Sequence, residues 1–224
     1  MNLVAIITFR EAIQIAKKLN CNWIALSYVK NSKIIKETRK LISTDMGIIA
    51  KVENKSALKN IKDIIQTSDA IMVARGDLAV EIGANEVPHV QLDIVKKCSE
   101  LGKPVIIATQ MLESMILDNK PTRAEINDVG TDIFQGAVVV MLSAETAVGK
   151  YPLQAVQAMK KTIVSTEKYK KEIEGINWQQ LKPLIEKLKM PLIVSIGFSR
   201  ESVAMMAIFS FFNKFSLITK LLMF

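Results

Sequence analysis

Five short apolar runs, separated by helix-like segments, constrain the fold of this chain more than any other feature. The runs are rich in strand-forming residues and span residues 23–29, 47–54, 70–77, 104–111 and 137–146. Helical spacing of apolar residues occupies residues 9–20, 55–68, 86–103 and 122–136. Strands that alternate with helices form parallel sheets with right-handed crossovers. The runs are almost continuously apolar, as expected for strands covered on both faces. The sequence therefore predicts an α/β fold.

Residues at the ends of the helical segments support this order. Thr8 is placed to cap the first segment. Gly102, shortly before Pro104, and Gly136 stand where C-terminal caps are expected. A further helical pattern follows at residues 152–171.

Polar residues arrive at the carboxyl end of every apolar run. They are Ser27; Lys51 and Glu53; Arg75 and Asp77; Thr109 and Gln110; and Ser143 and Glu145. In parallel α/β folds the carboxyl ends of the strands build the active site. This repeated placement predicts a functional site along one edge of the sheet.

Lys51 and Glu53 are two residues apart, so their side chains point to the same face of a strand, about 6.5–7 Å apart along it. They can form an ion pair or act as separate groups. Asp77 follows the next run and adds a second carboxylate. Two carboxylates from neighbouring strands suit Mg²⁺ or Mn²⁺. Lys51 beside such an ion would stabilise negative charge on an enolate or a transferred phosphoryl group.

Two further residues at this edge favour an anionic substrate. Gly76 allows backbone N–H groups to approach an anion closely. Thr109 offers a hydroxyl at the adjacent strand end. The spacing by itself indicates metal-assisted chemistry on a small anion and does not identify the substrate.

Five long motifs then resemble the pyruvate kinase family in order and approximate spacing. They read AKVENKSAL, SDAIMVARGDLAVEI, GKPVIIATQMLESM, PTRAEINDV and VVMLSAETAVGKYPLQAV. WIALSYVKN is similar to the preceding barrel strand of that family, and PLIVSIGFSRESVAMMA more weakly resembles the start of its C-terminal domain. The resemblance covers residues 5–165 well and residues 190–208 loosely.

The resemblance implies a partial (β/α)₈ TIM barrel, about strands 4–8, followed by a fragment of an α/β C-terminal domain. It divides the chain into a barrel part at residues 1–168, a linker or helix at 169–190 and a C-terminal fragment at 191–224. The last unit is expected to begin with a strand and continue as a helix.

The resemblance also implies the reaction and its residues. Lys51 takes the catalytic position, Glu53 and Asp77 the metal positions, and the substrate contacts fall on Arg75, Gly76, Asp77 and Thr109. The implied reaction transfers a phosphoryl group between phosphoenolpyruvate and ADP, giving pyruvate and ATP. The implied cofactors are Mg²⁺ (or Mn²⁺) and K⁺, with the K⁺ ligands expected in a preceding part of the barrel.

The chain also departs from the family pattern. Ala79 and Ala144 stand where the family usually has glycine, which often permits positive φ or close packing. A partial barrel leaves strand edges unpaired, so the isolated chain is expected to be poorly soluble or self-associating and to lack normal kinase activity. The alternative functions are a non-catalytic remnant, half of a split enzyme, and a Mg²⁺-dependent lyase or aldolase acting on pyruvate enolates. The possible partners are a second, complementing chain or further copies of this chain in a homo-oligomer.

Composition excludes several other classes. The net charge of +8 arises from lysines interspersed with acids, as on solvated helix faces, and no nucleic-acid motif accompanies it. Two cysteines and a single histidine, His89, do not favour a disulfide framework or a two-histidine metal site. The longest apolar run, residues 203–212, is too short to span a bilayer. A cytoplasmic protein without membrane or nucleic-acid partners is therefore expected.

Overall fold

The five apolar runs form five parallel strands of one sheet, as predicted. The computed structural model describes residues 9–43, 45–174 and 205–208. Its strands are β1 (Trp23–Leu26), β2 (Gly47–Val52), β3 (Ala70–Ala74), β4 (Val105–Ala108), β5 (Val139–Met141) and β6 (Met205–Ile208). They lie in the order β5-β4-β3-β2-β1-β6, with β1 to β5 parallel to their neighbours. Consecutive strands from β1 to β5 are therefore neighbours, which is the order of a barrel sheet, whereas β6 lies beside β1.

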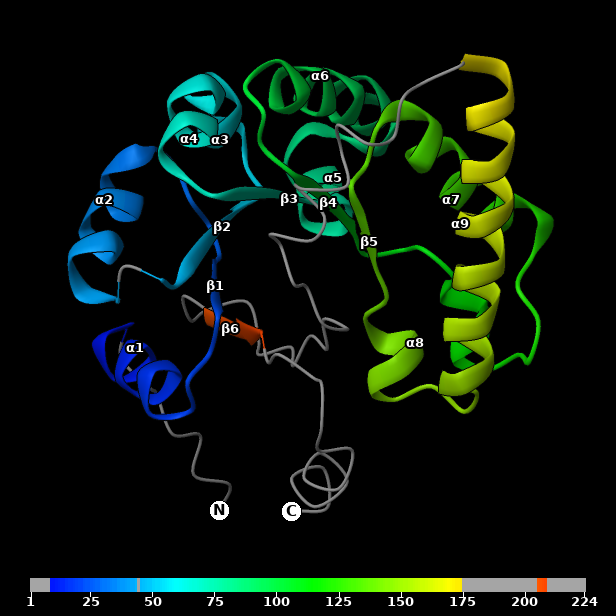
Figure 1. Cartoon of the computed structure of the whole chain (residues 1–224), viewed down its shortest axis with the longest axis horizontal. Coiled ribbons are helices and arrows are strands. Elements are labelled where there is room, and N and C mark those ends of the chain that lie inside the picture. Colours follow the sequence, from blue (N-terminus) through cyan, green and yellow to red (C-terminus); the bar gives the residue numbers. More distant parts are fainter. Residues whose placement is uncertain (1–8, 44, 175–204, 209–224) are drawn as a thin grey trace.

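The helices lie around the outside of this sheet (Figure 1). They are α1 (Phe9–Lys18), α2 (Ser32–Leu41), α3 (Lys55–Lys59), α4 (Ile61–Thr67), α5 (Arg75–Ile82), α6 (Val87–Glu100), α7 (Arg123–Gln135), α8 (Ala144–Ala147) and α9 (Pro152–Glu174), with short 3₁₀ turns η1 (Ala84–Glu86) and η2 (Glu113–Ile116). The predicted helical segments are confirmed, although residues 55–68 divide into α3 and α4 at Asn60. The sequence reading did not identify α2, which begins where the Asn31 side chain accepts a hydrogen bond from the backbone N–H of Lys33.

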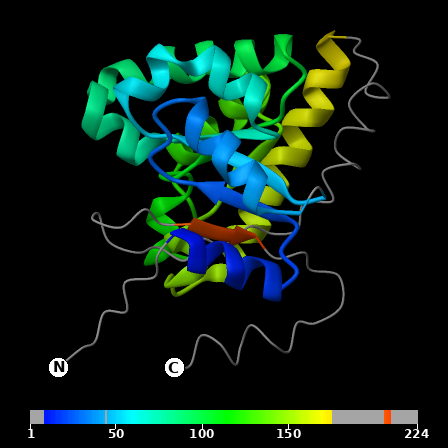
Figure 2. The same cartoon turned by 90° about the vertical axis from the view of Figure 1, so that its left-hand side faces the viewer.

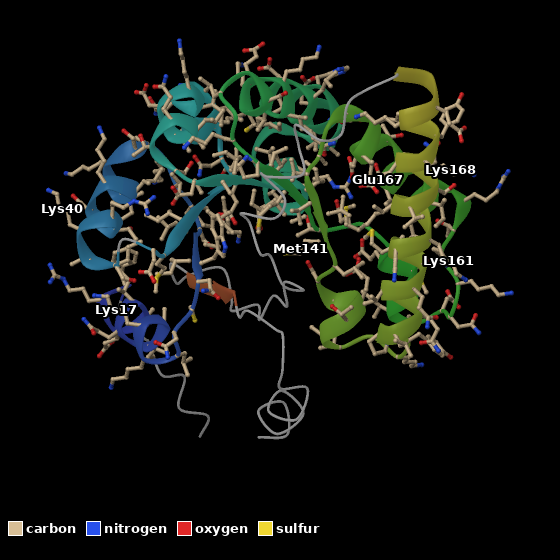
Figure 3. All side chains as sticks on the ribbon, in the orientation of Figure 1. Lys17, Lys40, Met141, Lys161, Glu167 and Lys168 are labelled. Atoms are coloured by element: carbon tan, nitrogen blue, oxygen red, sulfur yellow. The ribbon has the colours of Figure 1, made fainter. Side chains whose placement is uncertain are left out.

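Burial on both faces of the sheet explains why the strands are so continuously apolar. All five residues of β3 are buried. Alternate side chains enter a large core beneath the helices, which includes Ile71 and Val73, or a smaller cluster on the opposite face, which includes Met72 and Met141. Figure 3 shows Met141 pointing inward, whereas Lys17, Lys40 and Lys168 project from the outer helices. The lysine-rich faces are exposed there, as predicted.

Glycines end two helices as predicted. Gly102 has φ +63°, and Gly136 has φ +106°, a left-handed conformation that glycine adopts without a steric penalty. Thr8 lies outside the described residues. The predicted linker from residue 169 begins as helix, because α9 continues to Glu174; the rest of that linker also falls outside the described ranges.

Two sequence-based expectations are wrong. Arg75, Gly76 and Asp77 do not form the end of a strand, because β3 ends at Ala74 and α5 begins at Arg75. Met205–Ile208, expected in the helical part of a β-then-helix unit, is instead strand β6 and pairs antiparallel with β1. Figure 2 shows β6 running beside α1, with which it is in contact. Pairing with β1 supplies backbone hydrogen bonds that local helical spacing cannot anticipate.

Ala79 and Ala144 both lie in helices, in α5 and α8. Neither is among the non-glycine residues with positive φ in the described part of the chain. The backbone therefore does not require glycine at these two positions. Among the described residues, no helix is long and apolar enough to cross a membrane.

Candidate functional site

Lys51 and Glu53 meet at the carboxyl end of β2. Nζ of Lys51 lies 2.6 Å from Oε1 of Glu53 and donates to Oγ of Ser27 at 3.1 Å. Glu53 is only 1% exposed, and its Oε2 accepts the backbone N–H of Tyr28 at 2.5 Å. Both side chains reach the same side, as strand alternation predicted, and of the two alternatives left open the structure has the ion pair. Ser27 and Tyr28 follow β1, so this cluster ties two strand ends together.

The amino end of α5 follows β3, the strand next to the one that carries this pair. β2 and β3 are neighbours, with Val52 opposite Val73, so Glu53 and the first turn of α5 follow adjacent strand ends. Gly76 donates its N–H to Oγ1 of Thr109 at 2.9 Å, and Asp77 is exposed in the same turn. The positive end of a helix dipole and an exposed carboxylate therefore share one position, which suits an anion and a cation bound together.

The surroundings of Gly76 leave room for a side-chain Cβ atom. A Cβ atom built there would meet Thr109 Oγ1 at 3.5 Å, an ordinary contact, and the backbone is helical. By contrast, a Cβ at Gly47 would lie 2.3 Å from the Trp23 ring. Glycine is required by packing at position 47, whereas at position 76 the fold does not demand it.

Arg75 contacts α7 and the residues that follow β4. It is 8% exposed, and its Nη1 lies 2.6 Å from Oδ2 of Asp128 and 3.5 Å from Oδ2 of Asp132. It also borders a cavity of about 270 Å³ between α5, α6 and α7. The structure therefore places this predicted substrate-contact residue in a network within the helix layer.

Asp132 is the most perturbed carboxyl group described. Burial raises its pKa to about 6, the attraction of Arg75 opposes that rise, and the charge of Asp128 adds to it. A hydrogen bond from Nε2 of Gln91 to Oδ1 of Asp132, 2.7 Å long, acts in the same direction as Arg75. The network thus joins α5, α6 and α7.

Sequence reasoning missed Asp128, Asp132 and Gln91. The available signal was the spacing of the two aspartates, one helical turn apart in a segment whose apolar positions, Val129 and Ile133, face the core. Carboxylates beside the buried face of a helix indicate that a cation from a segment distant in sequence pairs with them. Only the fold shows that this cation is Arg75.

Glu145 links the segments that follow β4 and β5. It is 2% exposed, and its oxygens accept the backbone N–H groups of Leu112 at 3.0 Å and Ser143 at 2.7 Å. Oγ of Ser143 is buried without a hydrogen-bond partner among the described residues. His89 is exposed in the first turns of α6.

The donor set at the site fits Mg²⁺. The described residues hold no cluster of three or more His, Cys, Asp or Glu side chains suited to a metal. Mg²⁺ is commonly held by only one or two carboxylates and keeps its other positions for water and substrate oxygens. Glu53 and Asp77 supply two such carboxylates from neighbouring segments. Each Glu53 oxygen accepts one hydrogen bond or ion pair and retains a lone pair.

Comparison with known proteins now decides the family. The pyruvate kinase barrel domain, as a family pattern, matches residues 7–156. The chain belongs to the pyruvate kinase family. Its five parallel strands and their helices are part of the (β/α)₈ barrel of this family of phosphotransferases.

Individual relatives support the same family assignment. The chain is 49% identical over 161 residues to a pyruvate kinase from Agrobacterium vitis, covering 72% of this chain and 33% of that relative. It is 44% identical over 192 residues to a pyruvate kinase from Bacillus licheniformis, covering 84% and 31%. The crystal structure of a pyruvate kinase from Cryptosporidium parvum superposes with a TM-score of 0.70 at 37% identity, covering 80% of this chain and 38% of that one. The chain spans about a third of the length of these curated relatives.

Proposed function

We propose that this chain carries part of a pyruvate kinase site and takes part in phosphoryl transfer between phosphoenolpyruvate and ADP, giving pyruvate and ATP. One observation carries the proposal. The Lys51–Glu53 pair, the exposed Asp77 side chain and the Gly76–Thr109 contact lie at the carboxyl ends of three adjacent parallel strands, at the same edge of the sheet. Enzymes with this architecture assemble their chemistry at that edge.

Lys51 is the proposed catalytic residue. Its ammonium group is largely buried between Glu53 and Ser27, where a positive charge is screened less than in water. Negative charge that develops on an enolate oxygen or a transferring phosphoryl group would be stabilised by this ammonium group. Ser27 and Glu53 hold the side chain in place for that role.

Glu53 and Asp77 are the proposed Mg²⁺ or Mn²⁺ ligands. When bound, the ion would supply Lewis-acid polarisation of substrate oxygens. Asp77 is exposed and available, whereas Glu53 is fixed by the Tyr28 N–H and by Lys51. The family also implies K⁺, for which the described residues suggest no ligands.

Gly76 and Thr109 are the proposed contacts to the anionic part of the substrate. The start of α5 presents backbone N–H groups near a glycine that leaves room for close approach. Thr109 adds a hydroxyl that already accepts the Gly76 N–H and can donate its own proton. Arg75, expected as another contact, instead donates hydrogen bonds to the carbonyl groups of Thr109 and Gln110.

Turnover requires more than the described sheet, we infer, because a closed barrel has no edges and this sheet is open at β5. The remainder would come from a longer polypeptide, a second complementing chain or a second copy of this chain. A cytoplasmic setting agrees with the free cysteines Cys21 and Cys98, which are both buried.

The decisive test separates binding from turnover. Titration of the chain with Mn²⁺ and oxalate, an enolpyruvate mimic, should raise its melting temperature only when both are present. Co-expression with the amino-terminal part of the Agrobacterium vitis relative should then give ADP-dependent pyruvate formation. Absence of both effects would contradict the proposal and favour a non-catalytic remnant. Oxalate stabilisation with ADP-independent cleavage or formation of pyruvate would instead favour a lyase or aldolase.

A further inference from the structure

Two consecutive residues after β4 adopt an unusual backbone conformation. Thr109 has φ +69° and Gln110 has φ +54°. Positive φ is uncommon outside glycine and is especially unfavourable for a β-branched residue such as threonine. Such residues cost about 1–3 kcal/mol each and persist only where the surrounding structure holds them. The contacts that hold this turn therefore matter for the site.

The Arg75 guanidinium makes those contacts. Its Nε and Nη2 donate to the carbonyl oxygen of Thr109 at 3.1 and 3.0 Å, and Nη2 also donates to the carbonyl oxygen of Gln110 at 2.6 Å. Both left-handed residues are thus bound through their carbonyl groups by one planar cation. Lysine cannot reproduce this arrangement, because it presents a single ammonium group.

The guanidinium is itself fixed from the opposite side. Nη1 contacts Asp128 and Asp132 of α7, and Asp132 accepts a hydrogen bond from Gln91 of α6. Every guanidinium nitrogen therefore has a protein partner, and the side chain is buried. The cavity that Arg75 lines is bordered by α5, α6 and α7, and Lys51 and Glu53 are not among its lining residues.

We propose that Arg75 is a positioning residue, not a substrate contact. By holding Thr109 and Gln110 in the left-handed conformation, it fixes the Thr109 hydroxyl beside the Gly76 N–H. The start of α5 and the end of β4 are thereby aligned to receive one ligand. The alignment matters for ligand binding only if the proposed function holds, so the inference rests on that function. The alignment itself is tested without any ligand.

A rescue experiment tests this role. Arg75→Lys keeps the charge near Asp128 but removes the simultaneous contacts to the two carbonyl groups. Adding Gln110→Gly should compensate, because glycine adopts positive φ without support. Gln110→Gly alone should have little effect, since the Gln110 side chain is exposed and only its carbonyl group contacts Arg75. If Arg75 touched the substrate, Gln110→Gly would not restore the binding that Arg75→Lys removes.

Two readouts are taken on the full chain. The first is hydrogen exchange of the Gly76 amide by NMR without any ligand. Arg75→Lys should accelerate this exchange by about tenfold or more, in line with the strain that is released, and the double variant should recover most of the protection. The second is the affinity for oxalate in the presence of Mn²⁺, which should fall and recover in parallel.

The control is Arg39→Lys. Arg39 also pairs with an aspartate, Asp69, and donates to a carbonyl group, that of Met46, but at the amino ends of the strands. It should leave Gly76 exchange unchanged. If Arg75→Lys does not fold, Asp132→Asn, which loosens the anchor without touching the turn, should give a smaller acceleration in the same direction.

Three outcomes overturn the proposal: unchanged Gly76 exchange in Arg75→Lys, no recovery with Gln110→Gly, or recovered exchange with oxalate affinity still lost. The last would show that Arg75 contacts the ligand. If the parent chain does not bind Mn²⁺ and oxalate, the proposed function fails, while the exchange comparison still decides whether Arg75 positions Thr109.

Discussion

The Nζ atom of Lys51 lies 2.6 Å from Oε1 of Glu53, and the carboxylate is almost completely buried. A buried carboxylate needs a cation to offset the loss of water, and a catalytic ammonium group needs a fixed orientation. Mutation of either residue is therefore expected to change both stability and function.

Lys51→Met should destabilise the chain by about 3–5 kcal/mol at pH 7, because it leaves Glu53 buried and unpaired. Chemical denaturation measures this loss. Lys51→Met combined with Glu53→Gln should recover a large part of it, since the remaining amide oxygen can still accept the Tyr28 N–H. A double variant as unstable as Lys51→Met would show that the pair does not stabilise the fold through its charges.

Asp77→Asn should change the free energy of unfolding by no more than about 0.5 kcal/mol, because the side chain is exposed. The same substitution should abolish the Mn²⁺-dependent binding of oxalate measured by calorimetry. Asp63→Asn is the matched control, since Asp63 is an exposed aspartate in the first turn of α4. Equal binding by both variants would remove Asp77 from the metal site.

Gly76→Ala should fold normally and gain up to about 1 kcal/mol, because alanine is the better helix former and its Cβ has room. Its binding of oxalate with Mn²⁺ should nevertheless be lost, since the methyl group occupies the approach to the α5 backbone. Gly47→Ala gives the opposite pattern on stability: its Cβ would overlap the Trp23 ring, and overpacking costs about 1–3 kcal/mol. Retained oxalate binding in Gly76→Ala would contradict the proposed anion site.

Asp132 should make the chain less stable as pH rises through the window between its unfolded and folded pKa values. Its pKa rises from 3.8 to about 6 in the fold because of burial. The folded state therefore binds the proton more tightly, so this stability contribution is full below about pH 4 and is lost by about pH 6. The loss amounts to about 3 kcal/mol.

The measurement compares urea denaturation of the parent and of Asp132→Asn from pH 4 to pH 7. Carboxyl groups outside the network of Asp128, Asp132 and Arg75 titrate in both proteins and cancel in the difference. The parent should lose stability relative to the variant as pH increases. A constant difference across this range would show that Asp132 is ionised throughout.

Strand positions were predictable because they depend on local chemistry. Residues such as Ile71 and Val73 belong to runs so apolar that both faces had to be covered. Gly102 and Gly136 marked helix ends because left-handed backbone favours glycine. The gathering of Lys51, Glu53 and Asp77 at one edge followed from parallel topology, which places all carboxyl ends together.

The direction of a side chain, in contrast, depends on neighbours distant in sequence. The RGD segment reads as a charged strand end, and nothing local indicates that Arg75 turns toward α7 while Asp77 remains exposed. Likewise, Met205–Ile208 has no local signal that selects an antiparallel partner, because strand pairing is decided by whichever edge is available.

The sequence by itself thus determined the alternation of strands and helices, the family and the chemical groups at the strand ends. Only the tertiary structure decided that Lys51 and Glu53 pair directly and that Arg75 supports a strained turn. The physical reason is that burial and periodicity act over a few residues, whereas a buried charge takes its partner from any segment that the fold brings within hydrogen-bond distance.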